Sequence, residues 1–101
     1  MRYDKLVRDK IPEIVKKNGQ KPFFHIANNK EYEEKLLDKL KEEVFEFIKD
    51  KKIDEMADIF EVITAINSHN NWSLEKVIDI QKENRVQRGG FKNRIILDKV
   101  E

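Results

Sequence analysis

The sequence predicts an all-α fold, an antiparallel bundle of about four helices that is completed by oligomerisation. Apolar residues recur at three- and four-residue steps through the middle of the chain. Only 3 glycines and 2 prolines occur in 101 residues, and residues typical of helix caps and stops lie at the ends of the periodic segments. A chain of this length forms one domain, so we treat residues 1–101 as a single domain.

The first helix is predicted in the segment IPEIVKK. Asp9 is suited to be its N-cap, Pro12 fits a first turn, and Asn18-Gly19 is a typical helix end. The next segment, PFFHIA at residues 22–27, is aromatic and β-branched and predicts a short strand. The segment RIIL at residues 94–97 has a similar character and is able to pair with it in a small ribbon.

The second and third helices are predicted from Asn28 or Asn29 to about Lys49 and from about Ile53 to Asn67. The second has one apolar stripe, formed by Tyr32, Leu36, Leu40, Val44, Phe47 and Ile48. The third has a main apolar face of Ile53, Met56, Ala57, Phe60, Ile63 and Ile66, extended by Ile59, Val62 and Ala65. Because it is apolar on more than one side, we expect the third helix to be central, with neighbours from its own chain and from another subunit.

The fourth helix is predicted in the segment SLEKVIDIQKENRVQR. Ser73 is suited to cap it, and Gly89-Gly90 is expected to end it.

Four carboxylates have a regular spacing on the second and third helices. Glu43 and Glu46 are three residues apart, as are Glu55 and Asp58, so each pair projects from one side of its helix. Both cross-helix pairs, 43 with 58 and 46 with 55, have their midpoint at 50.5, inside the short linker DKK. An antiparallel hairpin therefore places the two pairs opposite each other at matching levels.

Four acids in such proximity would repel one another unless a cation neutralised them. All-oxygen ligation favours Mg²⁺, with Mn²⁺ as a substitute. The sequence contains no cysteine, which excludes thiolate zinc sites. Neither histidine has Glu three residues before it, which argues against a carboxylate-bridged di-iron site. The alternative is an ordinary solvated acidic face, but the apolar neighbours of Asp58 make an unpaired charge costly there.

The basic residues suggest a local phosphate site. The net charge of +1 gives no global attraction to nucleic acid or membranes, and we expect neither as a partner. On the fourth helix, however, three basic residues are spaced by three and form a stripe suited to a triphosphate: Lys82, Arg85 and Arg88. An ordinary solvated face would have the same spacing.

The segments EEVFE at 42–46 and EMAD at 55–58 resemble the EExxE and ExxD signature of the MazG-like all-α nucleoside triphosphate pyrophosphohydrolases, which include phosphoribosyl-ATP pyrophosphohydrolases. The terminal segments YDKLVRDKIPEIV and RVQRGGFKNRI resemble a compact subfamily of these enzymes. The resemblance implies magnesium-dependent hydrolysis between the α and β phosphates, with Glu43, Glu46, Glu55 and Asp58 as metal ligands and Glu43 or Glu46 orienting the water. Glu42 fills the first acid of the motif and is expected to support the ligands.

The same resemblance assigns substrate binding to the basic stripe on the fourth helix and to Lys5 and Arg8 near the N-terminus. The expected substrate is a nucleoside triphosphate or a related nucleotide. Phosphoribosyl-ATP hydrolysis in histidine biosynthesis and a non-catalytic nucleotide-binding module are the alternatives. We expect a homodimer or homotetramer, because the third helix is apolar on two faces in a small chain. We expect a cytoplasmic protein, because no apolar run has the length of a signal peptide core or a membrane span.

Overall fold

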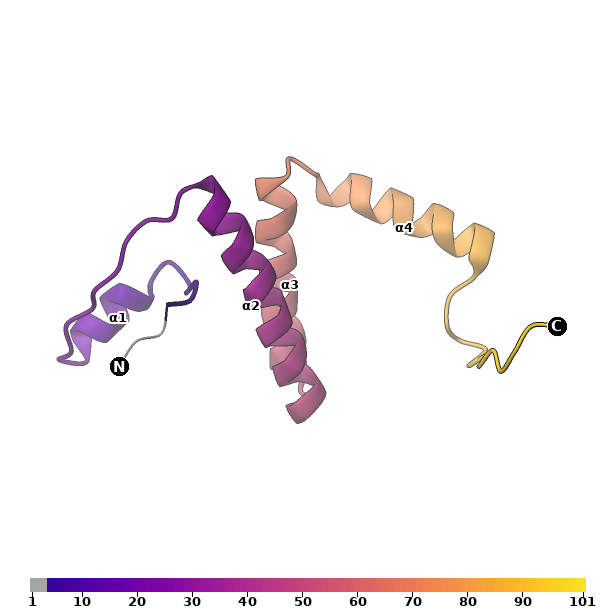
Figure 1. Ribbon diagram of the computed structural model, residues 1–101, viewed down its shortest axis with the longest axis horizontal. Coiled ribbons are helices and arrows are strands. Elements are labelled where there is room, and N and C mark those ends of the chain that lie inside the picture. Colours follow the sequence, from indigo (N-terminus) through magenta and orange to yellow (C-terminus); the bar gives the residue numbers. More distant parts are fainter. Residues whose placement is uncertain (1–3) are drawn as a thin grey trace.

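A computed structural model of the protein describes residues 4–101. These residues form the helices α1 (Ile11–Lys17), α2 (Asn29–Asp50), α3 (Ile53–His69) and α4 (Leu74–Arg88), and no strand. The predicted all-α chain with four helices is confirmed. Helices α2 and α3 form a central antiparallel hairpin, α1 lies on one side of it, and α4 extends away on the other (Figure 1). No helix in the described part of the chain combines the length and the apolarity needed to cross a membrane.

The helix ends follow the cap residues closely. The side chain of Asn28 accepts a hydrogen bond of 2.9 Å from the Glu31 amide. The Ser73 hydroxyl accepts one of 3.1 Å from the amide of Lys76, and Gly89 follows the last residue of α4 with φ 82°. Both caps were predicted and are confirmed.

The predicted cap of α1 is wrong by one residue. Lys10 is the N-cap and its side chain makes no capping hydrogen bond. The Ile11 amide instead donates to the carbonyl oxygen of Arg8 at 3.0 Å, so a backbone turn satisfies the group that the Asp9 side chain was expected to reach. The predicted end is confirmed, since α1 stops at Lys17 before Asn18 and Gly19.

The turn between α2 and α3 consists of two residues. Lys51 adopts a left-handed conformation with φ 53°, and its amide donates to the Phe47 carbonyl oxygen at 2.7 Å. So short a connection leaves the chain no room to cross over, and α3 returns along α2 (Figure 1). The hairpin geometry assumed for the carboxylates is therefore present.

The core of the chain is small and lies between α2 and α3. Leu36, Ile59 and Val62 are its buried hydrophobic residues among those described. The side of α3 that faces α2 is thus the extension of the predicted apolar face, and the main face itself is exposed at Ile53 and Phe60. Within the described residues α2 covers one apolar side of α3, and the second neighbour expected from another subunit stays a prediction.

The chain leaves far more surface exposed than its mass requires. Its accessible surface is 9869 Å², whereas a folded monomer of this size exposes roughly 6,000 Å². The radius of gyration is 18.1 Å, compared with about 13 Å for a compact domain of this length. Helix α4 contributes to both excesses because it has no buried residue.

The predicted strand at residues 22–27 is absent, and so is its ribbon with residues 94–97. The first segment lies beside α1 and the second follows α4, at opposite ends of a molecule with a longest extent of 60 Å (Figure 1). Neither segment has the other within reach in the same chain.

Candidate functional site

The carboxylates singled out by their spacing lie along the seam of the α2–α3 hairpin. Twelve acidic residues occur between residues 29 and 69, and those that are half-buried are Glu31, Glu42, Glu43, Glu46, Glu55 and Asp58. Glu31 is paired with His25 at 2.8 Å. The other five are the acids expected at a metal site. With about 100° of turn per residue, Glu46 and Asp58 project on the same side of the hairpin, which we call the acid face.

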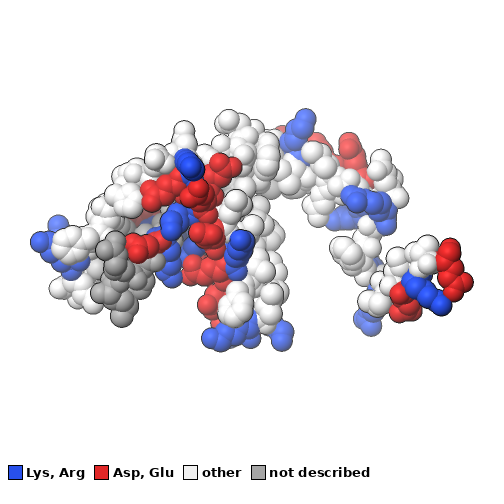
Figure 2. Space-filling view, viewed as in Figure 1, with Lys and Arg blue, Asp and Glu red and all other residues white. Residues whose placement is uncertain are grey.

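Arg8 joins the N-terminal segment to the acid face. Its guanidinium Nη2 donates to Asp58 Oδ1 at 2.9 Å, across 50 residues of sequence. Acidic side chains gather over the hairpin with basic side chains among them (Figure 2). The charge of Asp58 among apolar neighbours is therefore compensated by a cation from the same chain.

Glu42 and Glu43 share a second cation, Lys39. The Lys39 ammonium lies 3.5 Å from an oxygen of each carboxylate, and the Glu43 side chain is only 14 % exposed. Lys5 donates to Glu42 Oε1 at 3.0 Å. Burial by itself would raise the pKa of Glu42, but the hydrogen bond from Lys5 and the charge of Lys39 outweigh it, so this pKa is lowered.

The other end of the acid face, near the turn, holds a pair of acids. A side-chain hydrogen bond with Asp50 raises the pKa of Glu55, and desolvation and the charges of Asp50 and Asp58 act in the same direction. A proton shared by two carboxyl groups reduces their repulsion, as a metal ion would. Cations of the same chain thus pair with Glu42, Glu43 and Asp58, and the raised pKa of Glu55 favours its protonated form.

Sequence reasoning missed two of these residues. Lys39 carried a readable signal, since it precedes Glu42 by three residues and Glu43 by four on a predicted helix. Asp50 carried none, because its contact with Glu55 depends on the conformation of the turn.

The donor set fits a hard divalent cation. All its groups are carboxylates, and lysine and arginine cations already occupy the positions where positive charge is needed. As the side chains lie, no three acids or histidines within residues 4–101 converge closely enough to hold a metal ion. Mg²⁺ would therefore have to draw carboxylates away from their present partners.

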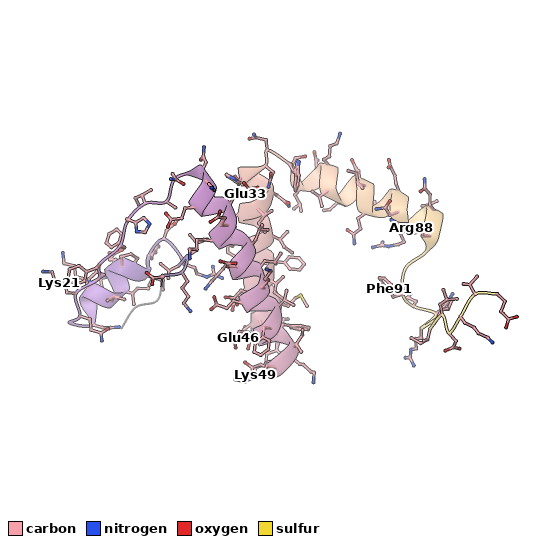
Figure 3. All side chains as sticks on the ribbon, in the orientation of Figure 1. Lys21, Glu33, Glu46, Lys49, Arg88 and Phe91 are labelled. Atoms are coloured by element: carbon pink, nitrogen blue, oxygen red, sulfur yellow. The ribbon has the colours of Figure 1, made fainter. Side chains whose placement is uncertain are left out.

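The basic stripe of α4 lies apart from the acid face within the chain. Arg88 stands at the far end of α4, well away from Glu46 on the hairpin (Figure 3). Lys82, Arg85 and Arg88 are all exposed. Of the basic residues expected to bind substrate, the structure brings only Lys5 and Arg8 to the acids.

Comparisons of the chain with protein-family models, with curated proteins and with solved structures found no match.

Proposed function

We propose that the protein is a magnesium-dependent nucleoside triphosphate pyrophosphohydrolase, which cleaves the α–β phosphoanhydride to a nucleoside monophosphate and pyrophosphate. The observation that carries the proposal is the acid face, where a seam of half-buried carboxylates is joined by exposed Lys5 and Arg8. The resemblance of EEVFE and EMAD to the signature of such enzymes supports the same reaction. The acids supply the ligands for the metal, and the bases supply contacts for phosphate.

Glu43, Glu46, Glu55 and Asp58 would hold the ion. A bound Mg²⁺ would neutralise phosphate charge and lower the pKa of a coordinated water. Glu43 or Glu46 would orient that water and accept its proton as the oxygen bonds to phosphorus and the bridging P–O bond breaks. Glu42 would keep Lys39 as its partner and hold the end of this set in place.

Arg8 and Lys5 would exchange partners when substrate binds. Their side chains are 57% and 44% exposed, so neither is fixed by burial in its present ion pair. Exposed pairs of this kind contribute about 0–1 kcal/mol, which a charged phosphate with its metal readily exceeds. The carboxylates would pass to Mg²⁺ and the cationic side chains to the triphosphate, so the charges on the acid face stay balanced throughout.

The functional unit is proposed to be a homodimer, or a homotetramer built from it. The excess accessible surface of the chain, roughly 3,800 Å² over the expectation for a monomer, is larger than the roughly 1,000–2,500 Å² that each chain of an obligate homodimer commonly buries. On the side of the hairpin opposite the acid face, both helices expose large apolar residues. We call this side the apolar face; it consists of Leu37, Val44, Phe45, Ile48, Ile53, Met56, Phe60 and Ile63.

Packing two apolar faces together would make a four-helix bundle and leave both acid faces open. It would also supply the second apolar neighbour that α3 lacks. The basic stripe of α4 remains a proposed phosphate contact, in a position that only the assembled protein would define.

The decisive experiment is hydrolysis of a panel of nucleoside triphosphates and phosphoribosyl-ATP with Mg²⁺, with products separated by chromatography. Monophosphate and pyrophosphate should appear, and Glu43→Gln and Asp58→Asn should each lower the rate by at least about a hundredfold. Even the mutation of a residue that only hydrogen-bonds to a metal ligand lowers activity or metal affinity by about 10–100-fold. Glu33→Gln is the matched control, because Glu33 is an exposed acid on the same helix. If no nucleotide is cleaved and neither Mg²⁺ nor Mn²⁺ raises the melting temperature, the proposal is wrong.

A further inference from the structure

Two extended segments of the chain expose apolar side chains that no other residue among 4–101 buries. In residues 22–27, Phe23, Phe24 and Ile26 are exposed, and Ile26 reaches 88 %. In residues 94–97, Ile95, Ile96 and Leu97 are exposed, and Ile96 reaches 81 %. Both segments are rich in aromatic or β-branched residues and belong to no helix, so each has the composition and the freedom to form a strand.

The two segments are kept apart by the helices between them. Lys21, next to the first segment, and Phe91, shortly before the second, lie at opposite ends of the molecule (Figure 3). The hairpin and α4 span this separation, and α4 has no buried residue that would hold it against the hairpin. Pairing within one chain would require the helices to be rearranged.

A second copy of the chain can place the two segments on the same side of a symmetric assembly. The hairpin forms the stem of the molecule, with the α1 arm on one side and α4 on the other (Figure 1). A two-fold axis parallel to the stem and running along the apolar face exchanges these sides, so the α1 arm of one protomer lies on the side where α4 of its partner extends. The same operation produces two equivalent contacts and closes the assembly.

The size of the exposed area favours a second copy of the chain, rather than an unrelated protein, as the partner that covers these segments. The roughly 3,800 Å² of excess surface per chain exceeds what a standard interface takes from each partner, about 800 Å², so covering the hairpin alone does not account for it. Two unpaired apolar segments of similar length within one sequence provide the remaining complementary surfaces. A symmetric dimer uses both of them in both chains.

We propose that residues 94–97 of one protomer pair with residues 22–27 of the other, forming two short β ribbons that fasten the dimer. The inference rests on the dimer proposed above and adds to it the exchange of the C-terminal segments. In this arrangement the segments contribute backbone hydrogen bonds as well as apolar contact.

The pairing can be tested by disulfide cross-linking, because the sequence contains no cysteine that would interfere. One chain carries Ile26→Cys, and a second chain of different mass carries Cys at position 95, 96 or 97 in turn, because successive strand residues point to opposite faces. The chains are mixed, allowed to exchange subunits and oxidised, and disulfide-linked heterodimers are measured by intact mass. A disulfide forms only where the two Cα atoms come within about 7 Å.

At least one position should give a linked heterodimer in several-fold greater yield than the control, in which Lys49→Cys, exposed at the tip of the hairpin, replaces Ile26→Cys. A chain with both cysteines should give a doubly linked dimer. A monomer closed by an internal disulfide would overturn the proposal, and so would heterodimer yields equal to the control at all three positions.

A second variant provides a test without new cysteines. Ile96→Asp should raise the dimer dissociation constant at least tenfold in sedimentation experiments, whereas Lys99→Ala, on the same exposed segment, should leave it unchanged. Equal dissociation constants for both variants would contradict the exchange. If the protein is a dimer that hydrolyses nucleotide but fails these tests, only the exchange is wrong; a strict monomer would refute the proposed assembly as well.

Discussion

Phe60 lies on the apolar face, and replacing it with alanine should weaken the dimer strongly. In the single chain, 63 % of the surface of Phe60 is exposed. Aromatic side chains bury about 150–250 Å², so roughly 130 Å² of Phe60 is left for a partner to cover, worth about 3 kcal/mol at 25 cal/mol per Å². Alanine keeps the β-carbon, and the loss is then about 2 kcal/mol per chain and about 4 kcal/mol per symmetric dimer. The dissociation constant should rise about 10³-fold.

Sedimentation velocity over a wide range of protein concentration measures this change. The variant should dissociate at concentrations where the wild type is fully dimeric, and its melting temperature should depend more steeply on concentration. Lys49→Ala, an exposed position on α2 away from the apolar face, should behave as the wild type. If Phe60→Ala and the wild type have the same dissociation constant, or if the wild type is a monomer at every concentration, the apolar face is not a subunit interface.

Three further predictions concern the acid face and α4. Arg8→Ala removes the guanidinium from Asp58, so calorimetry without nucleotide should find Mg²⁺ bound about two- to fivefold more tightly, as an exposed pair worth up to about 1 kcal/mol implies. The pKa of Glu55 is raised by its hydrogen bond with Asp50, so this group stabilises the fold below the ordinary carboxyl pKa, and that stability is lost as pH rises through the raised pKa. Asp50→Asn should therefore flatten the dependence of the urea midpoint on pH in that range. Arg85→Ala should raise KM for the nucleotide severalfold and leave Mg²⁺ affinity unchanged.

Matched controls make these predictions specific. Lys17→Ala removes a base that lies outside the acid face, Asp54→Asn an exposed acid near the same turn, and Gln87→Ala a polar residue of α4. Each control should leave the measured quantity at its wild-type value. Unchanged or weaker Mg²⁺ binding in Arg8→Ala would show that the arginine does not compete with the ion. An unaltered pH profile in Asp50→Asn would show that Asp50 does not raise the pKa of Glu55.

Most of the helical architecture was predictable because its signals are local. Asn28 and Ser73 cap the helices that follow them, Gly89 ends α4, and apolar periodicity identified both arms of the hairpin. The expectation that Glu43 lies level with Asp58 came from their spacing and the short linker alone, and it stays a prediction. These features depend on residues a few positions apart, where propensity and capping decide the structure.

What could not be predicted depends on contacts distant in sequence. The pairing of Arg8 with Asp58 across 50 residues has no local signal. Apolar periodicity showed that α3 has two faces, but it could not say which of them α2 would cover. The ribbon was an intrachain prediction, and the separation of its two segments only became apparent once α4 was seen to extend away from the hairpin.

The N-terminal arm, residues 4–17, is attached to the hairpin largely through charged groups. Lys5 of the arm pairs with Glu42, and Arg8 pairs with Asp58. The Lys35 ammonium of α2 donates to the carbonyl oxygen of Asp4 at 2.7 Å, and α1 itself has no buried residue. Hydrogen exchange should find the arm opening as a unit of its own, at much lower free energy than the hairpin and more readily as salt screens the contacts. The arm is then a cooperative unit of lower stability than the hairpin, and uncovering the acid face leaves the packing of Leu36, Ile59 and Val62 intact.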